Sequence, residues 1–265
     1  MSLLRLLFLF AAVFLVGCAR RPEAMTLAQA SDYDAIQSWM RQRPPDGESA
    51  PQIALLADAG TWPAGAIAIV AALESAGTPV HVGDHRLLTA ENLRPFHALI
   101  LPGGWAPLQR QAAGPQGLDA IQAFVADGGT CVGVCAGAYL VSRTVRWEGA
   151  TYEYAPALFD GIAEGPLNKY PVAESIQLRL TPAGALLGLP PDRSYYLNGG
   201  CAFIGGTNIT ALATFPNGAP AIISRPVGKG RVILLAVHPE HAPPPATSNL
   251  APGDTAKIYG ALLAP

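Results

Sequence analysis

Between residues 52 and 134 the chain alternates short apolar runs with segments of helical periodicity, and this alternation is the strongest constraint on its fold. The apolar runs predict strands over Ile53–Ala57, Pro79–Val82, His97–Leu101 and Thr130–Val134. The segments between them predict helices over Ala64–Ala76 and Gln116–Ala126. Strands and helices that alternate in this way form a parallel sheet with helices on both faces. Ligands of such sheets bind at the carboxyl ends of the strands.

After Ala150 the pattern becomes rich in strands. They are predicted over Ser175–Leu180, Ala211–Phe215, Ala221–Arg225 and Val232–Val237. Gly228-Lys229-Gly230 is typical of a hairpin turn between the last two, and residues 254–263 predict a closing helix. We therefore expect one α/β domain over residues 51–265, built on a mostly parallel sheet.

The first eighteen residues predict an export signal. An apolar run of twelve residues follows Arg5, which suits a secretory signal and is too short for a membrane span of about 20 residues. The run ends in Leu15-Val16-Gly17-Cys18, which resembles a bacterial lipobox. The resemblance implies that residues 1–17 are a lipoprotein signal peptide and that Cys18 is lipidated. An ordinary signal peptide and an uncleaved anchor are the alternatives.

Lipidation would anchor the protein in the cell envelope, with the membrane as its partner through Cys18. Since position 19 is Ala and not Asp, the lipoprotein sorting pattern favours the periplasmic face of the outer membrane in an organism that has one. Residues 18–50 are then expected to be a tether. It has room for a short helix over residues 26–40, with Tyr33, Ile36, Trp39 and Met40 on one stripe.

Composition excludes several classes of protein. Hydrophobic residues make up 50% of the 265 residues and charged residues only 14%, which excludes a disordered chain. The net charge of −2, without a basic stripe, leaves no electrostatic footprint for nucleic acid. Two histidine pairs, His81 with His85 and His238 with His241, lack further ligands at metal-binding spacing. We expect no metal, no cofactor and no nucleic-acid partner.

The fourth predicted strand continues into Gly133-Val134-Cys135-Ala136-Gly137 and then a helix start of small residues. A nucleophile on a sharp strand-to-helix turn needs small neighbours, because the backbone there is strained and closely packed. The turn also directs the next N–H group, that of Ala136, at the reacting carbonyl oxygen. Cys135 is therefore a candidate nucleophile, and the alternative is a buried structural thiol.

The candidate base is His238, in the segment His238-Pro239-Glu240 at the end of the last predicted strand. In extended backbone, residues i and i+2 point the same way, so Glu240 can accept from one imidazole nitrogen while the other faces Cys135. A core histidine and a solvated loop carboxylate are the alternatives for these two residues. A third segment, Leu101 to Trp105, ends a strand in Gly103-Gly104. The backbone N–H groups of these glycines can serve as a second donor to an oxyanion. The alternative is that Gly103-Gly104 only forms a turn.

Together these segments resemble the class I glutamine amidotransferase-like superfamily. The closer resemblance is to the N-terminal domain of some biotin–protein ligases, which also occurs as stand-alone bacterial proteins. Four segments carry it: Leu101-Pro102-Gly103-Gly104, Gly129 to Tyr139, Tyr195 to Gly200, and His238-Pro239-Glu240. In the related DJ-1/PfpI-like branch a histidine commonly follows the cysteine directly, whereas here Ala136 does.

The resemblance implies a flavodoxin-like α/β fold and a Cys135–His238–Glu240 triad, but no known substrate. Candidate pocket residues are Trp105, Tyr139, Asn198, Gly199, Gly200 and Cys201, and an ordinary turn is the alternative for Asn198-Gly199-Gly200. Cys201 stands where the family tends to have a third glycine, and a disulfide is an alternative role for it. Cys131, four residues before Cys135 on one strand, is expected to be core. Asp58, at the end of the first strand, has either a place near the nucleophile or an ordinary turn role.

Two functions follow as hypotheses. The first is a cysteine-dependent hydrolase of an amide or related acyl bond in the envelope. The second is a ligand-binding or scaffolding lipoprotein that keeps the same fold without chemistry. Ammonia transfer from glutamine is disfavoured, because this chain carries no synthase domain to receive the ammonia.

Overall fold

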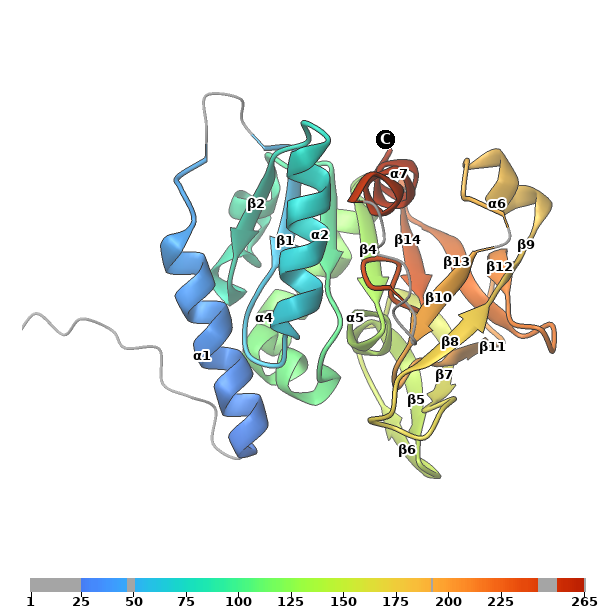
Figure 1. Cartoon of the computed structure of the whole chain (residues 1–265). Coiled ribbons are helices and arrows are strands. Elements are labelled where there is room, and N and C mark those ends of the chain that lie inside the picture. Colours follow the sequence, from blue (N-terminus) through green and yellow to red (C-terminus); the bar gives the residue numbers. More distant parts are fainter. Residues whose placement is uncertain (1–24, 47–50, 192, 243–251, 265) are drawn as a thin grey trace, which may run out of the picture.

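In the computed structural model of the chain, residues 25–46, 51–191, 193–242 and 252–264 are described. An eight-stranded sheet in the order β2-β1-β3-β4-β14-β13-β12-β9 forms its centre (Figure 1). Strands β2 to β14 in this order are parallel, and β14 to β9 are antiparallel. The strands are β1 (Ile53–Leu56), β2 (Val80–Gly83), β3 (Ala98–Leu101), β4 (Thr130–Val134), β9 (Arg179–Leu180), β12 (Thr210–Thr214), β13 (Pro220–Val227) and β14 (Gly230–Leu235).

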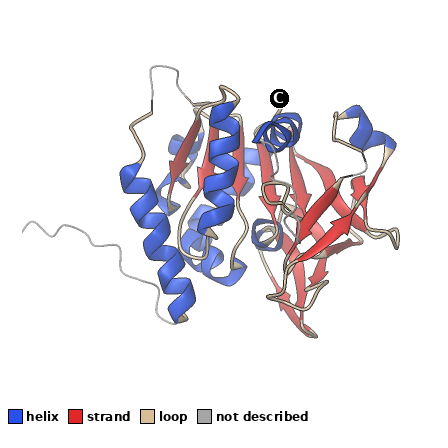
Figure 2. Cartoon of the chain, in the orientation of Figure 1, coloured by secondary structure: helices blue, strands red, loops and turns tan. Residues whose placement is uncertain are grey.

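Helices cover both faces of this sheet (Figure 2). Helix α2 packs against α7 on one face with α1 beside it, and α4 lies on the other face with α3. The helices are α1 (Leu27–Gln42), α2 (Pro63–Ser75), η1 (His85–Leu87), α3 (Ala90–Leu93), α4 (Ala106–Ala126), α5 (Ala136–Leu140), α6 (Pro182–Leu186) and α7 (Pro252–Leu263). The predicted fold class is confirmed: a flavodoxin-like α/β arrangement with a mostly parallel sheet.

Two smaller sheets lie beside the antiparallel end of the main sheet. One has the order β11-β7-β5-β6, and the other pairs β10 with β8. Their strands are β5 (Ser142–Trp147), β6 (Ala150–Glu153), β7 (Phe159–Gly165), β8 (Glu174–Gln177), β10 (Ser194–Leu197) and β11 (Ala202–Ile204). The single strand predicted over Ser175–Leu180 is wrong, because β8 pairs with β10 while β9 pairs with β12.

Two element boundaries differ from the predicted ones in ways that shape the site. Helix α4 begins at Ala106 and not at Gln116, and it crosses a kink at Gly114, whose φ is 62°. The kink precedes Pro115, which has no backbone N–H to donate inside a helix. Strand β14 ends at Leu235 and not at Val237. The chain after Leu235 is therefore free to turn across the carboxyl ends of the strands.

The predicted tether contains a docked helix. Helix α1 starts with a capping box in which Thr26 and Gln29 exchange hydrogen bonds. Ile36, on the apolar stripe of α1, is fully buried in the main core, and Trp39 and Met40 pack against that core. The folded part of the chain thus begins before residue 51. The expected signal peptide and Cys18 lie outside the described residues. Among the described residues, no helix has the length and apolar character to cross a bilayer.

Candidate active site

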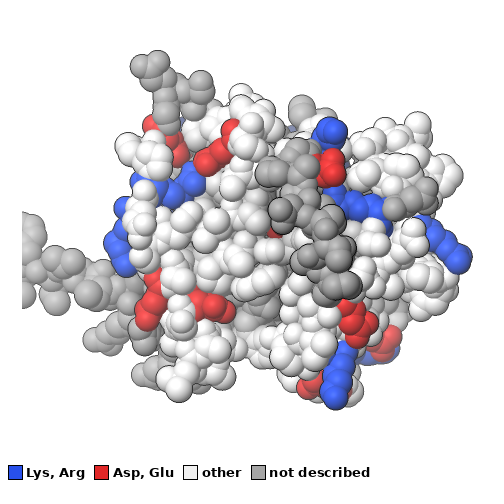
Figure 3. All heavy atoms as spheres, in the orientation of Figure 1, with Lys and Arg blue, Asp and Glu red and all other residues white. Residues whose placement is uncertain are grey.

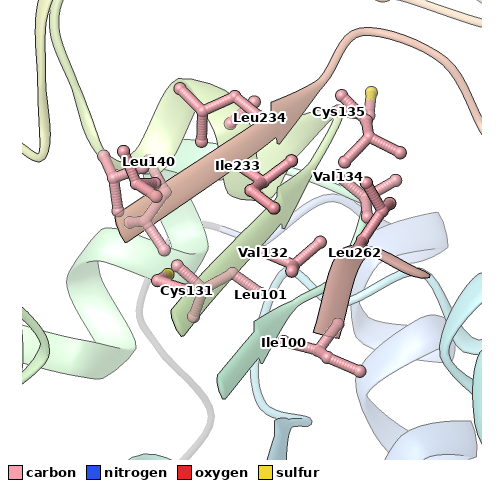
Figure 4. Packing of buried hydrophobic residues seen from close by; sticks show 14 of the residues in the cluster. Ile100, Leu101, Cys131, Val132, Val134, Cys135, Leu140, Ile233, Leu234 and Leu262 are labelled. Atoms are coloured by element: carbon pink, nitrogen blue, oxygen red, sulfur yellow. The ribbon is translucent and has the colours of Figure 1, made fainter. Parts of the chain in front are cut away.

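Cys135 lies at the sharp turn between β4 and α5, where the sequence predicts a nucleophile. Its backbone has φ 48° and ψ −105°, a conformation that is strained for a residue with a side chain. A Cβ on Gly137 would lie 2.0 Å from the carbonyl oxygen of Leu101, and one on Gly133 would lie 2.8 Å from that of Gly137. Both glycines are therefore required for the turn to pack against β3 and β4. Figure 4 shows the Cys135 sulfur at the carboxyl end of β4, with Cys131 at the other end.

His238 is held beside Cys135 by contacts from three segments. Its backbone N–H donates to Tyr196 of β10 at 2.9 Å. Its ring lies edge-on to Trp62, with the centroids 5.3 Å apart. A Cβ on Gly103 would lie 2.6 Å from Cε1 of His238, so only glycine at this position admits the imidazole. The side chain of His238 is almost completely buried and interacts electrostatically with Cys135.

Glu240 orients the imidazole from the side away from the nucleophile, as predicted. Nδ1 of His238 lies 2.8 Å from Oε1 of Glu240, and the hydroxyl of Tyr259 donates to Oε2 at 2.9 Å. All three side chains are buried, and Tyr259 comes from α7. Both oxygens of this buried carboxylate are therefore paired.

The electrostatics of this group favour an ion pair. Burial by itself disfavours the imidazolium, but the charges of Glu240 and Cys135 and hydrogen bonds to both raise the pKa of His238 to about 10. Burial alone would raise the pKa of Glu240, and the positive His238 instead holds it below its usual value. An imidazole that keeps its proton in this way is suited to donate it to a leaving group.

Two backbone N–H groups point to an oxyanion site. Ala136 is the first residue of α5, so its N–H has no partner inside the helix. Gly104 lines the same cavity as Cys135, and no backbone hydrogen bond between described residues uses its N–H. The neighbouring N–H of Trp105 donates to the carbonyl oxygen of Gly60 at 2.6 Å. Gly103, which the sequence also nominated, instead accepts from Trp62 at 2.9 Å and gives room to His238.

The segment Tyr195 to Gly200 packs around the nucleophile and the base. The Cys135 thiol lies 3.6 Å from the carbonyl oxygen of Asn198. The carbonyl of Gly199 accepts from the hydroxyl of Tyr139 at 3.0 Å, and its N–H donates to Asn168 at 2.8 Å. A Cβ on Gly200 would lie 2.0 Å from the carbonyl oxygen of Ala236. Gly200 therefore allows close backbone packing and does not line the pocket.

An aromatic pocket of about 650 Å³ opens at Cys135. Trp147 is its centre, in edge-on contact with Trp105 at 6.1 Å, Tyr139 at 5.6 Å and Tyr170 at 5.5 Å between ring centroids. Its aromatic lining comprises Trp105, Tyr139, Trp147, Tyr152, Tyr154 and Tyr170. The predicted pocket residues Trp105, Tyr139, Asn198 and Gly199 line it, whereas Cys201 does not.

A second, more polar groove meets the aromatic pocket at Cys135. Its walls include Thr61, Trp62 and His238, together with Gln29 and Asp32 of α1. We refer to these two cavities as the aromatic pocket and the α1 groove. Cys135 is thus reached from two sides that differ in chemistry.

Several nominated residues have other roles. Cys201 is fully buried and, like Cys131 and Cys135, is a free thiol, so the disulfide alternative is wrong for the described cysteines. Burial raises the pKa of Cys131 to about 12, in keeping with a core role. Asp58 does not approach the nucleophile, because its carboxylate accepts from the backbone N–H of His85 at 2.9 Å and contacts Nδ1 of the ring at 2.7 Å.

Asp58, His85 and Asp84 bring three potential metal-ligand atoms within 4.8 Å of one another. Both oxygens of Asp84 are engaged by the guanidinium of Arg86 at 2.6 to 3.0 Å. This cluster is therefore built as a network of ion pairs around the end of β2.

Sequence reasoning missed Trp62, Asn168, Tyr259 and Asp32. Each reaches the site from an element far away in the chain, and each occupies a position that local periodicity assigns to an ordinary helix or loop. For Trp147 and Tyr170 a signal existed, since aromatic residues are dense between Tyr139 and Tyr170. No local spacing rule connects them to Cys135.

Comparisons with known proteins agree with this geometry. Residues 80–261 match the family model described as the N-terminal domain of biotin-protein ligase. An uncharacterised protein of Chlamydia muridarum (strain MoPn / Nigg) is 27% identical over 157 residues, which are 55% of this chain and 61% of that protein. This chain thus spans less than two thirds of that curated relative.

Solved structures share the fold at low identity. A glutamine amidotransferase superposes with a TM-score of 0.58 and 17% identity, covering 80% of this chain and 97% of the other. Gan42B, a GH42 beta-galactosidase from G. stearothermophilus, superposes with a TM-score of 0.52 and 15% identity. There the match covers 80% of this chain but only 29% of the galactosidase. Similarities at this level of identity establish the fold alone.

Proposed function

This chain belongs to the family of the biotin-protein ligase N-terminal domain, and on that premise we propose that it is an envelope-anchored hydrolase that cleaves an amide or related acyl bond with Cys135. The observation that carries the proposal is the continuous line of contacts from Cys135 through His238 and Glu240 to Tyr259. A nucleophile, a base and an orienting carboxylate in this sequence of contacts are the parts of a catalytic triad.

The first half of the reaction is acyl transfer to the sulfur. The sulfur of Cys135 attacks the carbonyl carbon while the proton of the Cys135–His238 pair is held on His238. The carbonyl oxygen becomes an oxyanion, which the N–H groups of Ala136 and Gly104 stabilise. His238 then donates its proton to the leaving amine, the carbon–nitrogen bond breaks, and a thioester on Cys135 remains.

The second half is hydrolysis of that thioester. A water molecule attacks the thioester carbonyl while His238 takes one of its protons. The carbon–sulfur bond breaks, the acid leaves, and the proton taken from water stays on His238, which restores the starting Cys135–His238 pair. One amide and one water thus give one acid and one amine, with the protein unchanged.

The anchoring part of the proposal rests on Leu15-Val16-Gly17-Cys18. We expect the protein made in a bacterial host to sediment with membranes and to incorporate labelled fatty acid. Cys18→Ala should abolish both. Incorporation of fatty acid into the Cys18→Ala variant would contradict this part and leave the catalytic part untouched.

The catalytic part is tested with p-nitrophenyl acetate, whose activated acyl group reports on the thiol without knowledge of the natural substrate. We expect the full chain to release a burst of nitrophenol and to carry the acetyl group on Cys135, as located by peptide mass spectrometry. Cys135→Ala should lose the burst, and His238→Ala should slow it by about 10²-fold or more. Cys131→Ser is the matched control, because it removes a buried core thiol and should leave the burst unchanged.

A burst that is equally fast in His238→Ala would show that Cys135 reacts as an ordinary thiol. The second hypothesis, a ligand-binding or scaffolding lipoprotein, would then be preferred. It has its own support in the aromatic pocket, which can hold a ligand without chemistry. A beta-galactosidase carries the same fold over 29% of its own chain. A fold that serves as one part of a larger protein agrees with the hypothesis of ligand binding or scaffolding.

A further inference from the structure

The two cavities that meet at Cys135 differ in what they can bind. They share Gly104, Trp105, Tyr170 and Asn198, which surround the sulfur. A substrate whose carbonyl lies at Cys135 therefore extends into the aromatic pocket in one direction and into the α1 groove in the other. The two ends of the substrate are recognised separately.

The aromatic pocket suits an uncharged, apolar group. Six aromatic rings line it, and no charged side chain is among its described lining residues. Its single unpaired buried acceptor is Oδ1 of Asn198, which is suited to an N–H of the substrate. An aromatic or apolar substituent next to the scissile amide would pack against the aromatic lining, and an N–H of the substrate would pair with Oδ1 of Asn198.

The α1 groove carries negative charge. Asp32 is the only acidic side chain among its described lining residues, and neither cavity is lined by a described Lys or Arg. No described residue forms an ion pair with Asp32, and burial raises the pKa of its carboxyl group. Its charge also contributes, after burial and Cys135, to raising the pKa of Tyr170 across the groove.

The charge of α1 is divided along its length. In the view of Figure 3, acidic atoms lie over the lower, amino-terminal half of α1 and basic atoms over its upper half. Asp32 and Asp34 belong to the first half, and Arg41 to the last turn. No described Lys or Arg lines the α1 groove, so a carboxylate in the groove would find the carboxylate of Asp32 and no described cation.

We propose that the cleft selects an amide with an aromatic or apolar group on one side of the scissile carbonyl and a positively charged amine or guanidinium on the other, bound by Asp32. The hydrolysis of that amide rests on the proposed function, whereas the recognition does not. Helix α1 lies outside residues 80–261, which match the family model.

The test is a set of three chloroacetamides that share a benzyl group and end in a trimethylammonium, a neutral amide or a carboxylate. Labelling of Cys135 in the full chain is timed by mass spectrometry. We expect the cationic probe to react about three to ten times faster than the anionic one, the range of a partly exposed ion pair. Asp32→Asn should remove this preference, and Asp32→Lys should invert it.

Asp34→Asn is the matched control, since it removes the same charge from the exposed side of the same helix. It should keep the wild-type preference. Equal rates for the three probes, or an equal loss of preference in Asp34→Asn, would overturn the role of Asp32. Trp147→Ala should slow the benzyl probes relative to a methyl analogue, and an unchanged ratio would overturn the role of the aromatic pocket.

Labelling needs the thiol but no turnover, so the two proposals fail separately. Charge-selective labelling without hydrolysis of the matching benzyl amides would contradict the hydrolase and keep the recognition. Hydrolysis without charge preference would contradict the recognition and keep the hydrolase.

Discussion

Oε1 of Glu240 lies 2.8 Å from Nδ1 of His238, across a single intervening proline. The backbone of the two residues is not a strand, because β14 ends at Leu235 and a turn follows His238. The imidazole is therefore fixed by contacts around it and not by a regular element. Five predictions follow from this arrangement and from the packing that supports it.

At position 135, a glycine should give a more stable protein than an alanine. We expect Cys135→Gly to be more stable than Cys135→Ala by about 1 kcal/mol, because φ 48° with ψ −105° costs energy only in residues with a Cβ. Urea unfolding of both variants measures the difference. The same pair at Cys131, inside β4, should show the opposite order. The same order at both sites would mean that the turn at Cys135 is not strained.

Gly103→Ala should damage the site more than the fold. Its new Cβ would lie 2.6 Å from Cε1 of His238, so the ring must move away from Cys135. We expect the acylation burst to slow by about tenfold or more, since proton transfer depends on that position. Gly260→Ala in α7 meets no atom within 4 Å and should leave the burst unchanged while stabilising the helix by up to about 1 kcal/mol. A normal burst in Gly103→Ala would refute the steric argument.

Tyr259→Phe should destabilise the protein by about 1–3 kcal/mol, because it leaves Oε2 of the buried Glu240 without a donor. Urea unfolding checks this value. Tyr152→Phe removes a hydroxyl from a side chain that is 47% exposed and should change stability by less than about 0.5 kcal/mol. If the two variants were equally stable, the hydroxyl of Tyr259 would contribute nothing to the pair.

The ion pair predicts how stability depends on pH. The pKa of His238 is about 10 in the folded protein against 6.5 as its ordinary value, so its contribution is complete below pH 6.5 and is lost as the pH rises toward 10. The pKa of Glu240 is lowered from 4.5, so its contribution is present above pH 4.5 and is lost on acidification. The measurement is thermal unfolding of the wild type and of His238→Gln from pH 4 to 10. The stability difference between the two proteins should shrink at high pH. A difference that stays constant from pH 6.5 to 10 would contradict it.

Ile36→Ala should destabilise the whole domain by about 2–5 kcal/mol, because the side chain is fully buried in the main core. It should also expose α1 to limited proteolysis. Ala35→Ser, on the exposed side of the same turn, should change stability by less than about 0.5 kcal/mol. A neutral Ile36→Ala would mean that α1 is only a tether.

The sequence by itself determined the parts of this protein that depend on local backbone. Short apolar runs located the parallel strands β1 to β4 within one residue of their ends, because strands buried on both faces are short and nearly continuously apolar. The small residues on both sides of Cys135 indicated the sharp turn, since only glycine fits where Gly133 and Gly137 pack. The spacing of His238 and Glu240 indicated their contact, although a turn after His238 and not extended backbone brings the two side chains together.

Tertiary structure decided the rest. The apolar run from 175 to 180 divides between two sheets, and α1 docks through Ile36, because partners far along the chain select these pairings. Tyr259, Trp62 and Asp32 come to the site from three separate helices or their ends. Local periodicity encodes which face of an element is apolar, but not which distant element covers that face. The turn that presents Cys135 could therefore be located in the sequence, whereas the two cavities that determine what reaches Cys135 exist only after the chain has folded.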